Sequence, residues 1–199
     1  VLMNIDPDIF RIKSNDVPPE KGKLLLAEPF LPDLNFRRAV VLLIEHNLNG
    51  AMGIVFNHMF SNLTLNKVVK DLSVKVPIPL FNGGPVSNDT LFYLHTMEHI
   101  PGSLFVQEGL YLNGDFDLIK TMLEEGEDLN GKIRFFLGCS GWGYDQLQNE
   151  LKQNSWIVSQ EKTEVLLSTP PNNLWQQIMI NQGGKYSIWA KYPLNAGVN

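Results

Sequence analysis

The stretch FLGCSGWGYDQLQNELKQNSWIV, residues 136–158, decides how the chain is interpreted. Its order indicates an apolar strand, a glycine-rich turn, a helix and a second strand. This order suits a catalytic turn, an anion cradle or a structural corner. We favour the corner, because glycines allow backbones to approach closely while Trp142 packs under the turn. Leu147 and Leu151, four residues apart, then direct the helix onto the sheet.

Polar groups beside this corner give it a second possible use. Gln146 and Glu150 are spaced to lie on the same side of the helix and to join neighbouring loops by hydrogen bonds. A polar pair next to an aromatic ring is also how a ligand groove is built. We therefore expect a structural corner that lines a binding groove rather than a catalytic turn.

The chemical alternatives for the same stretch are weaker. A catalytic serine turn requires G-x-S-x-G, but the fifth position here is Trp142, and nothing selects a base among the four histidines. Three glycines before a helix resemble a phosphate cradle, yet the Lys-Ser/Thr of a Walker A loop and the G-x-G-x-x-G pattern are both missing. No nucleotide site or cofactor is predicted.

Cys139 is the single cysteine of the chain. If it lies where a strand ends and a helix begins, the helix N-terminus lowers the pKa of its thiol and favours the reactive thiolate. The alternative is a buried cysteine that behaves as a small apolar side chain. Only His95 and His99 have a helical i, i+4 spacing, so we expect ordinary surface histidines and no metal site.

Apolar runs along the rest of the chain predict more strands than helices. Buried strands are expected at 23–29 and 36–46, followed by a third at 50–58 that completes a meander. Further strands are expected at 76–86, 90–96, 103–114, 132–138, near 155–158 and at 164–168. Helices are expected at 64–72 (capped by Thr64 or Asn62), 116–125 (capped by Asp115), 144–153 and 171–181. This irregular order indicates an α+β fold.

Length and charge exclude several classes of protein. The 199 residues favour one domain, assigned to 21–199, with residues 1–20 as an N-terminal arm. A net charge of −5 argues against a general polyanion partner. No secretory signal and no membrane-length apolar run is visible, so we expect a cytoplasmic protein without a membrane partner.

Four segments, in this order, resemble the AlgH/YqgE family of bacterial proteins, UPF0301. They are GKLLLAEPFLPDLNFRRAVVLLIEH, GAMGIVFNH, NGGPV and GCSGWGYDQLQNELKQNSW. The resemblance implies a strongly bent, branching sheet that forms a pseudo-barrel. We expect this sheet to be mostly antiparallel and flanked by about four helices. The family is labelled as transcriptional regulators, and no enzymatic activity is established for it. Cys139 departs from the family motif, so any thiol function would be particular to this chain and its close relatives.

Matching motif positions supply the candidate binding residues, which are Asp33, Arg38, His46, Asn57, Gly83, Gly84, Pro85, Gly141, Trp142 and Gln146. We expect a non-enzymatic regulatory or binding protein whose partner is an unknown protein or small ligand. The alternative is an enzyme of unknown reaction with a site near Gly83–Pro85 and Ser140–Gln146. We expect no direct binding of duplex DNA, since the basic residues are scattered and an internal Asp33–Arg38 ion pair could remove one of their charges from the surface.

Overall fold

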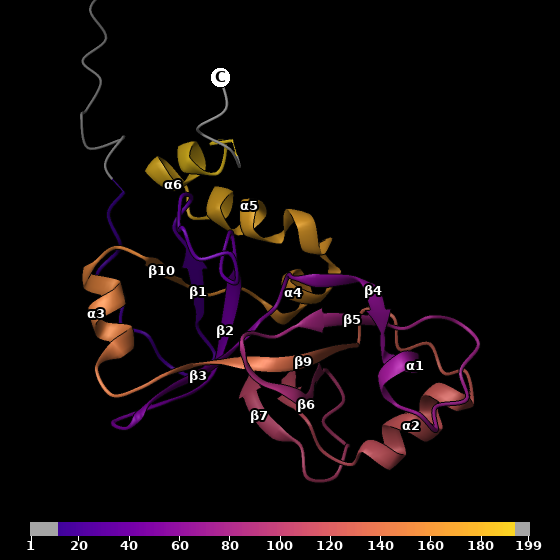
Figure 1. The fold of residues 1–199 in the computed structure, drawn as a ribbon. Helices are drawn as coiled ribbons and strands as arrows, with labels where there is room; N and C mark the ends of the chain where they lie inside the picture. Colours follow the sequence, from indigo (N-terminus) through magenta and orange to yellow (C-terminus); the bar gives the residue numbers. More distant parts are fainter. Residues whose placement is uncertain (1–11, 194–199) are drawn as a thin grey trace, which may run out of the picture.

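The computed structural model describes residues 12–193, which form one α+β domain around a branched, mostly antiparallel sheet of ten strands (Figure 1). Hydrogen-bonded neighbours follow the order β10-β1-β2-β3-β9-β6-β8-β7, and β5 with β4 forms a branch from β9. The sheet does not close on itself. The predicted bent and branching sheet is therefore confirmed, whereas the pseudo-barrel is an open sheet with β10 and β7 at the ends of the main path.

The strands are β1 Leu24–Ala27, β2 Val40–Asn47, β3 Gly50–Val55, β4 Met59–Thr64, β5 Pro79–Asn82, β6 Val86–His95, β7 Leu104–Gln107, β8 Leu110–Leu112, β9 Ile133–Trp142 and β10 Trp156–Ser159. The helices are α1 Leu65–Val68, α2 Phe116–Glu124, α3 Gln146–Lys152, α4 Thr163–Ser168, α5 Pro171–Asn181 and α6 Gly184–Trp189. None of the described helices combines the length and the apolarity needed to cross a membrane.

The predicted meander is confirmed, because β1, β2 and β3 pair consecutively and antiparallel. Its strands are buried on both faces. Leu24 and Leu26 contribute to a first core, and Leu25, one residue on, contributes to a second core on the opposite face. Continuous apolar runs are typical of strands covered on both sides, which is why this part of the sequence lacks a polar alternation.

Helices cover both faces of this part of the sheet (Figure 1). Residues of α4, α5 and α6 complete the first core, and Leu147 of α3 packs into the second core with Trp142 and Trp156. A third core joins α1 and α2 to the region of β5, β6 and β9. Asp115 caps α2 as predicted, since its side chain accepts a hydrogen bond from Leu118 N at 3.1 Å.

Three predictions about helices were wrong. The helix expected at 64–72 ends at Val68, since Val69 is extended, and the Thr64 side chain makes no capping hydrogen bond. The strand expected at 164–168 is helix α4, because its short apolar run is compatible with either structure until Leu166 and Leu167 pack into the first core. With α6, which was not predicted, the described residues contain six helices rather than about four.

The described part of the N-terminal arm lies along the exposed edge of β10. Ser14 Oγ donates to Trp156 O at 2.6 Å. Asn15 makes a pair of bonds with Val158, donating to its carbonyl at 2.7 Å and accepting from its amide at 3.0 Å. The Asn15 side chain thus occupies the place of a neighbouring strand and covers part of a sheet edge. Residues 1–11 of the arm lie outside the described residues.

Strand β9 is where the sheet branches. One edge of β9 pairs first with β5 in parallel, through Phe135–Leu137, and then with β3 antiparallel, through Ser140–Trp142. The change of partner occurs at Gly138, whose φ of +74° favours glycine. This residue also breaks the alternation of side chains along the strand. Phe136 and Cys139, three residues apart, both contribute to the first core.

Two glycines from the β5–β6 connection cross β9 at this point. Gly83 N donates to Leu137 O at 2.8 Å, and Gly83 O accepts from Val55 N of β3 at 2.8 Å. A Cβ atom at Gly83 would lie 2.1 Å from Gly138 O, and one at Gly84 would lie 2.4 Å from Cys139 O. Backbones this close leave no space for any side chain, so the branch depends on glycine.

We expect Gly83→Ala to lower the free energy of unfolding by about 2–3 kcal/mol, because the added methyl group overlaps a main-chain carbonyl that cannot move freely. Gly141→Ala is the matched control on the same sheet, since its Cβ would meet no atom closer than 3.9 Å. Urea unfolding followed by circular dichroism measures both variants. Equal stability of the two variants would show that the crossing tolerates a side chain.

Candidate functional site

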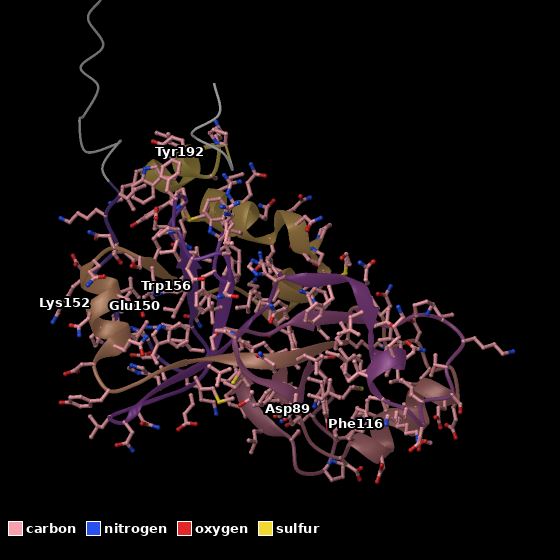
Figure 2. The ribbon with its side chains drawn as sticks, in the orientation of Figure 1. Asp89, Phe116, Glu150, Lys152, Trp156 and Tyr192 are labelled. Carbon is pink, nitrogen blue, oxygen red and sulfur yellow. The ribbon has the colours of Figure 1, made fainter. Side chains whose placement is uncertain are left out.

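The carboxylate of Glu150 is the centre of the hydrogen bonds within residues 136–158. Its Oε2 accepts hydrogen bonds from both buried indoles, Trp142 Nε1 at 2.8 Å and Trp156 Nε1 at 2.7 Å. The two indole rings meet edge to face with centroids 5.9 Å apart. Figure 2 shows Glu150 and Trp156 beside each other, between α3 and the sheet. One carboxylate therefore satisfies two donors that the turn and β10 bring into the second core.

Gln146 completes this arrangement from the first turn of α3. Its Oε1 accepts from Gly143 N at 3.1 Å, and its Nε2 donates to Glu150 Oε1 at 3.0 Å. Trp142 is only 5% exposed, as predicted. The predicted hydrogen bonds of Gln146 and Glu150 are present, and they join the turn to α3 and β10. A shallow cavity of about 250 Å³ lies between Trp142 and the β2–β3 hairpin.

The segments proposed for an enzyme meet at the branch of the sheet. Ser140 lies against Gly84 and its Oγ donates to Gly83 O at 3.3 Å, while Pro85 is exposed. Ser140 is 0% exposed and lies within β9, not on a strained turn. A nucleophilic serine has to be accessible to its substrate, and Ser140 is not accessible in this structure. Close packing of the main chains therefore explains why Gly83, Gly84 and Ser140 lie together, and no catalytic role is needed to explain it.

Cys139 does not lie at a helix N-terminus. It is buried within β9, three residues before the strand ends, and its side chain belongs to the first core. Burial raises the pKa of the thiol, and a hydrogen bond from Ser87 offsets only part of this effect. The thiolate is the reactive form of cysteine, and burial favours the neutral thiol. Cys139 therefore fits the hypothesis of a buried cysteine that behaves as a small apolar side chain.

Arg38 and Asn57 lie together, but Asp33 does not join them. Asn57 Nδ2 donates to Arg38 O at 3.0 Å, and Asn57 Oδ1 accepts from Val40 N at 2.8 Å. The Arg38 guanidinium lies over the Trp175 ring at 4.8 Å and donates to Tyr192 O. Asp33 accepts instead from Asn35, and neither ion pair within residues 12–193 includes Arg38. The Asp33–Arg38 ion pair that the sequence allowed is not formed in the described part of the chain.

The histidines are spread over different parts of the structure. His46 is half-buried in β2, and His58 bonds to Arg37 O at 3.1 Å. His95 is not a surface residue, because it is fully buried and bonds to Asn113 O at 2.7 Å. Burial lowers the pKa of His95, as does the nearby charge of His99. No three His, Cys, Asp or Glu side chains of the described residues are grouped to hold a metal ion.

A larger cavity than the one beside Trp142 lies elsewhere. It measures about 640 Å³ and is formed by the 74–79 segment, β5, the 126–131 loop, the start of β9 and the contact of α4 with α5. This volume falls within the range of small-molecule sites. Most of its wall is apolar, from residues that include Met59, Val76, Ile78, Phe81, Leu123 and Leu167.

Arg134 of β9 places a positive charge in the wall of this cavity. It is only 8% exposed, and its guanidinium lies 4.6 Å from the ring centroids of both Phe56 and Phe81. Nη1 donates to Phe56 O at 3.0 Å and Nη2 to Leu167 O at 3.3 Å. Burial lowers the pKa of Arg134 to about 10, so the side chain stays protonated at neutral pH.

Sequence reasoning missed both Arg134 and this cavity. A signal was present, because Arg134 is the one charged residue inside the apolar run IRFFLG of 133–138. An arginine in the middle of a buried strand must satisfy its guanidinium inside the protein, which makes it a candidate for function. The cavity walls themselves come from loops far apart in sequence, and no local pattern brings them together.

Comparisons with known proteins agree on one family. The profile of the family described as AlgH-like (DUF179) matches residues 24–187. A UPF0301 protein of Bacteroides fragilis is 47% identical over 197 residues, covering 99% of this chain and 100% of the relative. A UPF0301 protein of Bacteroides thetaiotaomicron is 47% identical over 191 residues, covering 96% and 97%.

Two solved structures share the fold. A crystal structure of a protein from Corynebacterium diphtheriae has a TM-score of 0.73 at 20% identity and covers 96% of this chain and 100% of its own. The solution structure of the AlgH protein of Pseudomonas aeruginosa has a TM-score of 0.68 at 29% identity, covering 90% and 98%. The first supports the fold alone, whereas the second also agrees with the family match.

We expect Trp142→Ala to lower the free energy of unfolding by about 3–5 kcal/mol, since it empties a core position and removes one donor to Glu150. Gln148→Ala, at an exposed position of the neighbouring helix α3, is the control and should change stability by less than about 0.5 kcal/mol. Thermal unfolding of both variants checks this. A wild-type melting temperature for Trp142→Ala would mean that the ring serves recognition instead.

Proposed function

Because the chain belongs to the AlgH-like family of bacterial proteins, we propose that it is a non-enzymatic regulatory protein of the cytoplasm that binds a small ligand. One observation carries this proposal, namely the apolar cavity of about 640 Å³ with the buried Arg134 in its wall. A binding protein needs such an apolar wall with few polar groups to orient a ligand.

The surroundings of the cavity support binding rather than catalysis. Its wall contains no histidine, cysteine or serine, and its acidic members Glu127 and Asp128 come from a loop. Catalysis by a nucleophile or a general base requires a reactive group held next to a second group that activates it. Ser140 and Cys139 are both buried at the branch of the sheet, and neither lines this cavity.

In this proposal, binding of the ligand changes the conformation of the loops around the cavity. That change alters how the protein binds a partner protein. The segment 74–79 and the loop 126–131 both border the cavity, and Val76 is 70% exposed. Exposed loops that line a cavity can change conformation when the cavity fills, which is how a ligand shifts a protein between states.

The first test is affinity purification of the chain from a bacterial lysate, followed by mass spectrometry of small molecules released on denaturation. We expect an apolar small molecule to co-purify with the wild type. It should be lost from Val76→Asp, which places a charge in the wall, and retained by Leu48→Asp, whose position is 89% exposed in the β2–β3 turn. Equal recovery with all three chains, or none from any, would contradict the proposal.

The second test concerns DNA, because we propose that regulation does not involve direct binding to a duplex. Non-specific DNA binding needs clustered free Lys and Arg side chains that release counterions. Arg38 is held by Trp175 and Tyr192, and Lys23 bonds to Pro18 O and pairs with Glu20. We expect no saturable anisotropy change with random-sequence duplex at about 50 mM salt. Low-micromolar binding that weakens steeply with added salt would overturn this.

A further inference from the structure

The charge of Arg134 lacks an acidic partner. The two ion pairs found within residues 12–193 are Lys23–Glu20 and Lys120–Glu124, both elsewhere. Two carbonyl oxygens accept hydrogen bonds from the guanidinium, which has five N–H groups in all. Carbonyl groups and ring faces orient the cation but do not neutralise it, so a nearly buried positive charge remains in an apolar wall.

The guanidinium also retains an N–H donor without a hydrogen-bond partner among the described residues. Among the described side chains, only Arg38 Nε and Gln107 Oε1 are sealed from solvent without a hydrogen-bond partner. Arg134 Nε has no partner in any hydrogen bond of the described residues, so it keeps some access to solvent. Because Arg134 lines the cavity, an anion inside the cavity would find a donor already held in place.

The rest of the cavity selects an apolar body for the ligand. Val76, Ile78 and Leu123 are typical of its wall. Glu127 and Asp128 also line the cavity and carry negative charge, which weakens the binding of any anion and opposes a multiply charged ligand most strongly. A singly charged anion with a hydrocarbon chain satisfies both conditions, whereas a nucleotide or a sugar phosphate satisfies neither.

We infer that this cavity binds an aliphatic monocarboxylate, with its carboxylate at Arg134 and its hydrocarbon chain against the apolar wall. This inference rests on the proposed ligand-binding function and names the ligand class. Arg134 recognises the carboxylate through charge-assisted hydrogen bonds, and burial of the chain supplies most of the affinity.

The first experiment is isothermal titration of the wild-type chain with hexanoate, octanoate and decanoate, each below its critical micelle concentration. We expect one site per chain and an affinity that rises about fourfold for each added methylene group, as burial of a CH₂ predicts. Decanol, which has the same chain without the charge, should bind about tenfold more weakly than decanoate. Decanol affinity equal to that of decanoate would overturn the role of Arg134.

Variants locate the binding site. Arg134→Gln keeps an amide donor but removes the charge, and should weaken decanoate about tenfold while leaving decanol unchanged. Because Arg134 also joins β9 to Phe56 and Leu167, this variant is first checked for folding by circular dichroism. Val76→Asp offers a second variant at an exposed position of the wall, and it should weaken decanoate more than decanol. Leu48→Asp is its control and should match the wild type.

A gain of affinity gives an independent test. Glu127→Gln removes one negative charge from the cavity wall, so decanoate should bind about two- to fivefold more tightly at low salt. Unchanged or weaker decanoate binding in Glu127→Gln, or equal decanoate affinity in Val76→Asp and Leu48→Asp, would place the carboxylate elsewhere.

The outcome also separates this inference from the proposed function. If decanoate fails to bind while decanol, or an uncharged molecule from the lysate, binds in a way that Val76→Asp abolishes, the cavity is a ligand site but the ligand class is wrong. If no small molecule of either kind binds, both the inference and the ligand-binding function are wrong.

Discussion

The close crossing of Gly83 and Gly84 over Gly138 is the contact on which the rest of the fold depends. At this point the main chain of β9 leaves β5 and takes β3 as its neighbour, while Gly83 bonds to both β9 and β3. Without side chains at these positions, three strands can share one short region. The left-handed backbone of Gly138 also changes which side chains of β9 point to each face of the sheet. Side chains of β9 therefore pack into more than one core.

The two ends of strand β9 therefore lie in different environments. At its C-terminal end, Trp142 is fixed in the second core by Glu150 and Trp156, and this end supports architecture. Towards its N-terminal end, Arg134 faces Phe56, Phe81 and the large cavity, and carries a charge that no acidic side chain of residues 12–193 neutralises. Buried charge without a partner costs stability, which is the physical reason to look for function there rather than at the glycine-rich turn.

Patterns within a few neighbouring residues predicted those parts of the fold that interactions between neighbouring residues determine. The apolar runs of β1 and β2, the Asp115 cap and the Gln146–Glu150 spacing each have a short-range cause, and each is present in the structure. The resemblance to the family added the branching sheet. The helix at 163–168 was mistaken for a strand because its apolar run is too short to show a period, and only packing against the first core decides it.

The candidate site was harder to predict, for a different physical reason. Neither of the two cavities described above is lined by Asp33, His46 or Pro85. Arg38 and Asn57 are joined by a hydrogen bond that connects two segments of the main chain. Glycine-rich motifs draw attention because their backbone is unusual, yet here that backbone serves the crossing of strands. The cavity is lined by residues that lie between Met59 and Pro171 in the sequence, so only the folded chain brings its wall together around Arg134.

Native-state hydrogen exchange tests the central claim, that the crossing at Gly83 and Gly138 is the last part of the fold to open. The amide hydrogens to follow are Val55 N–H and Gly83 N–H, which bond to Gly83 O and Leu137 O. If the crossing holds the sheet together, both should exchange only through global unfolding, with the free energy and denaturant dependence of complete unfolding. Exchange of these two amides through local openings that are insensitive to denaturant, while amides of β1 and β2 remain protected, would contradict the account.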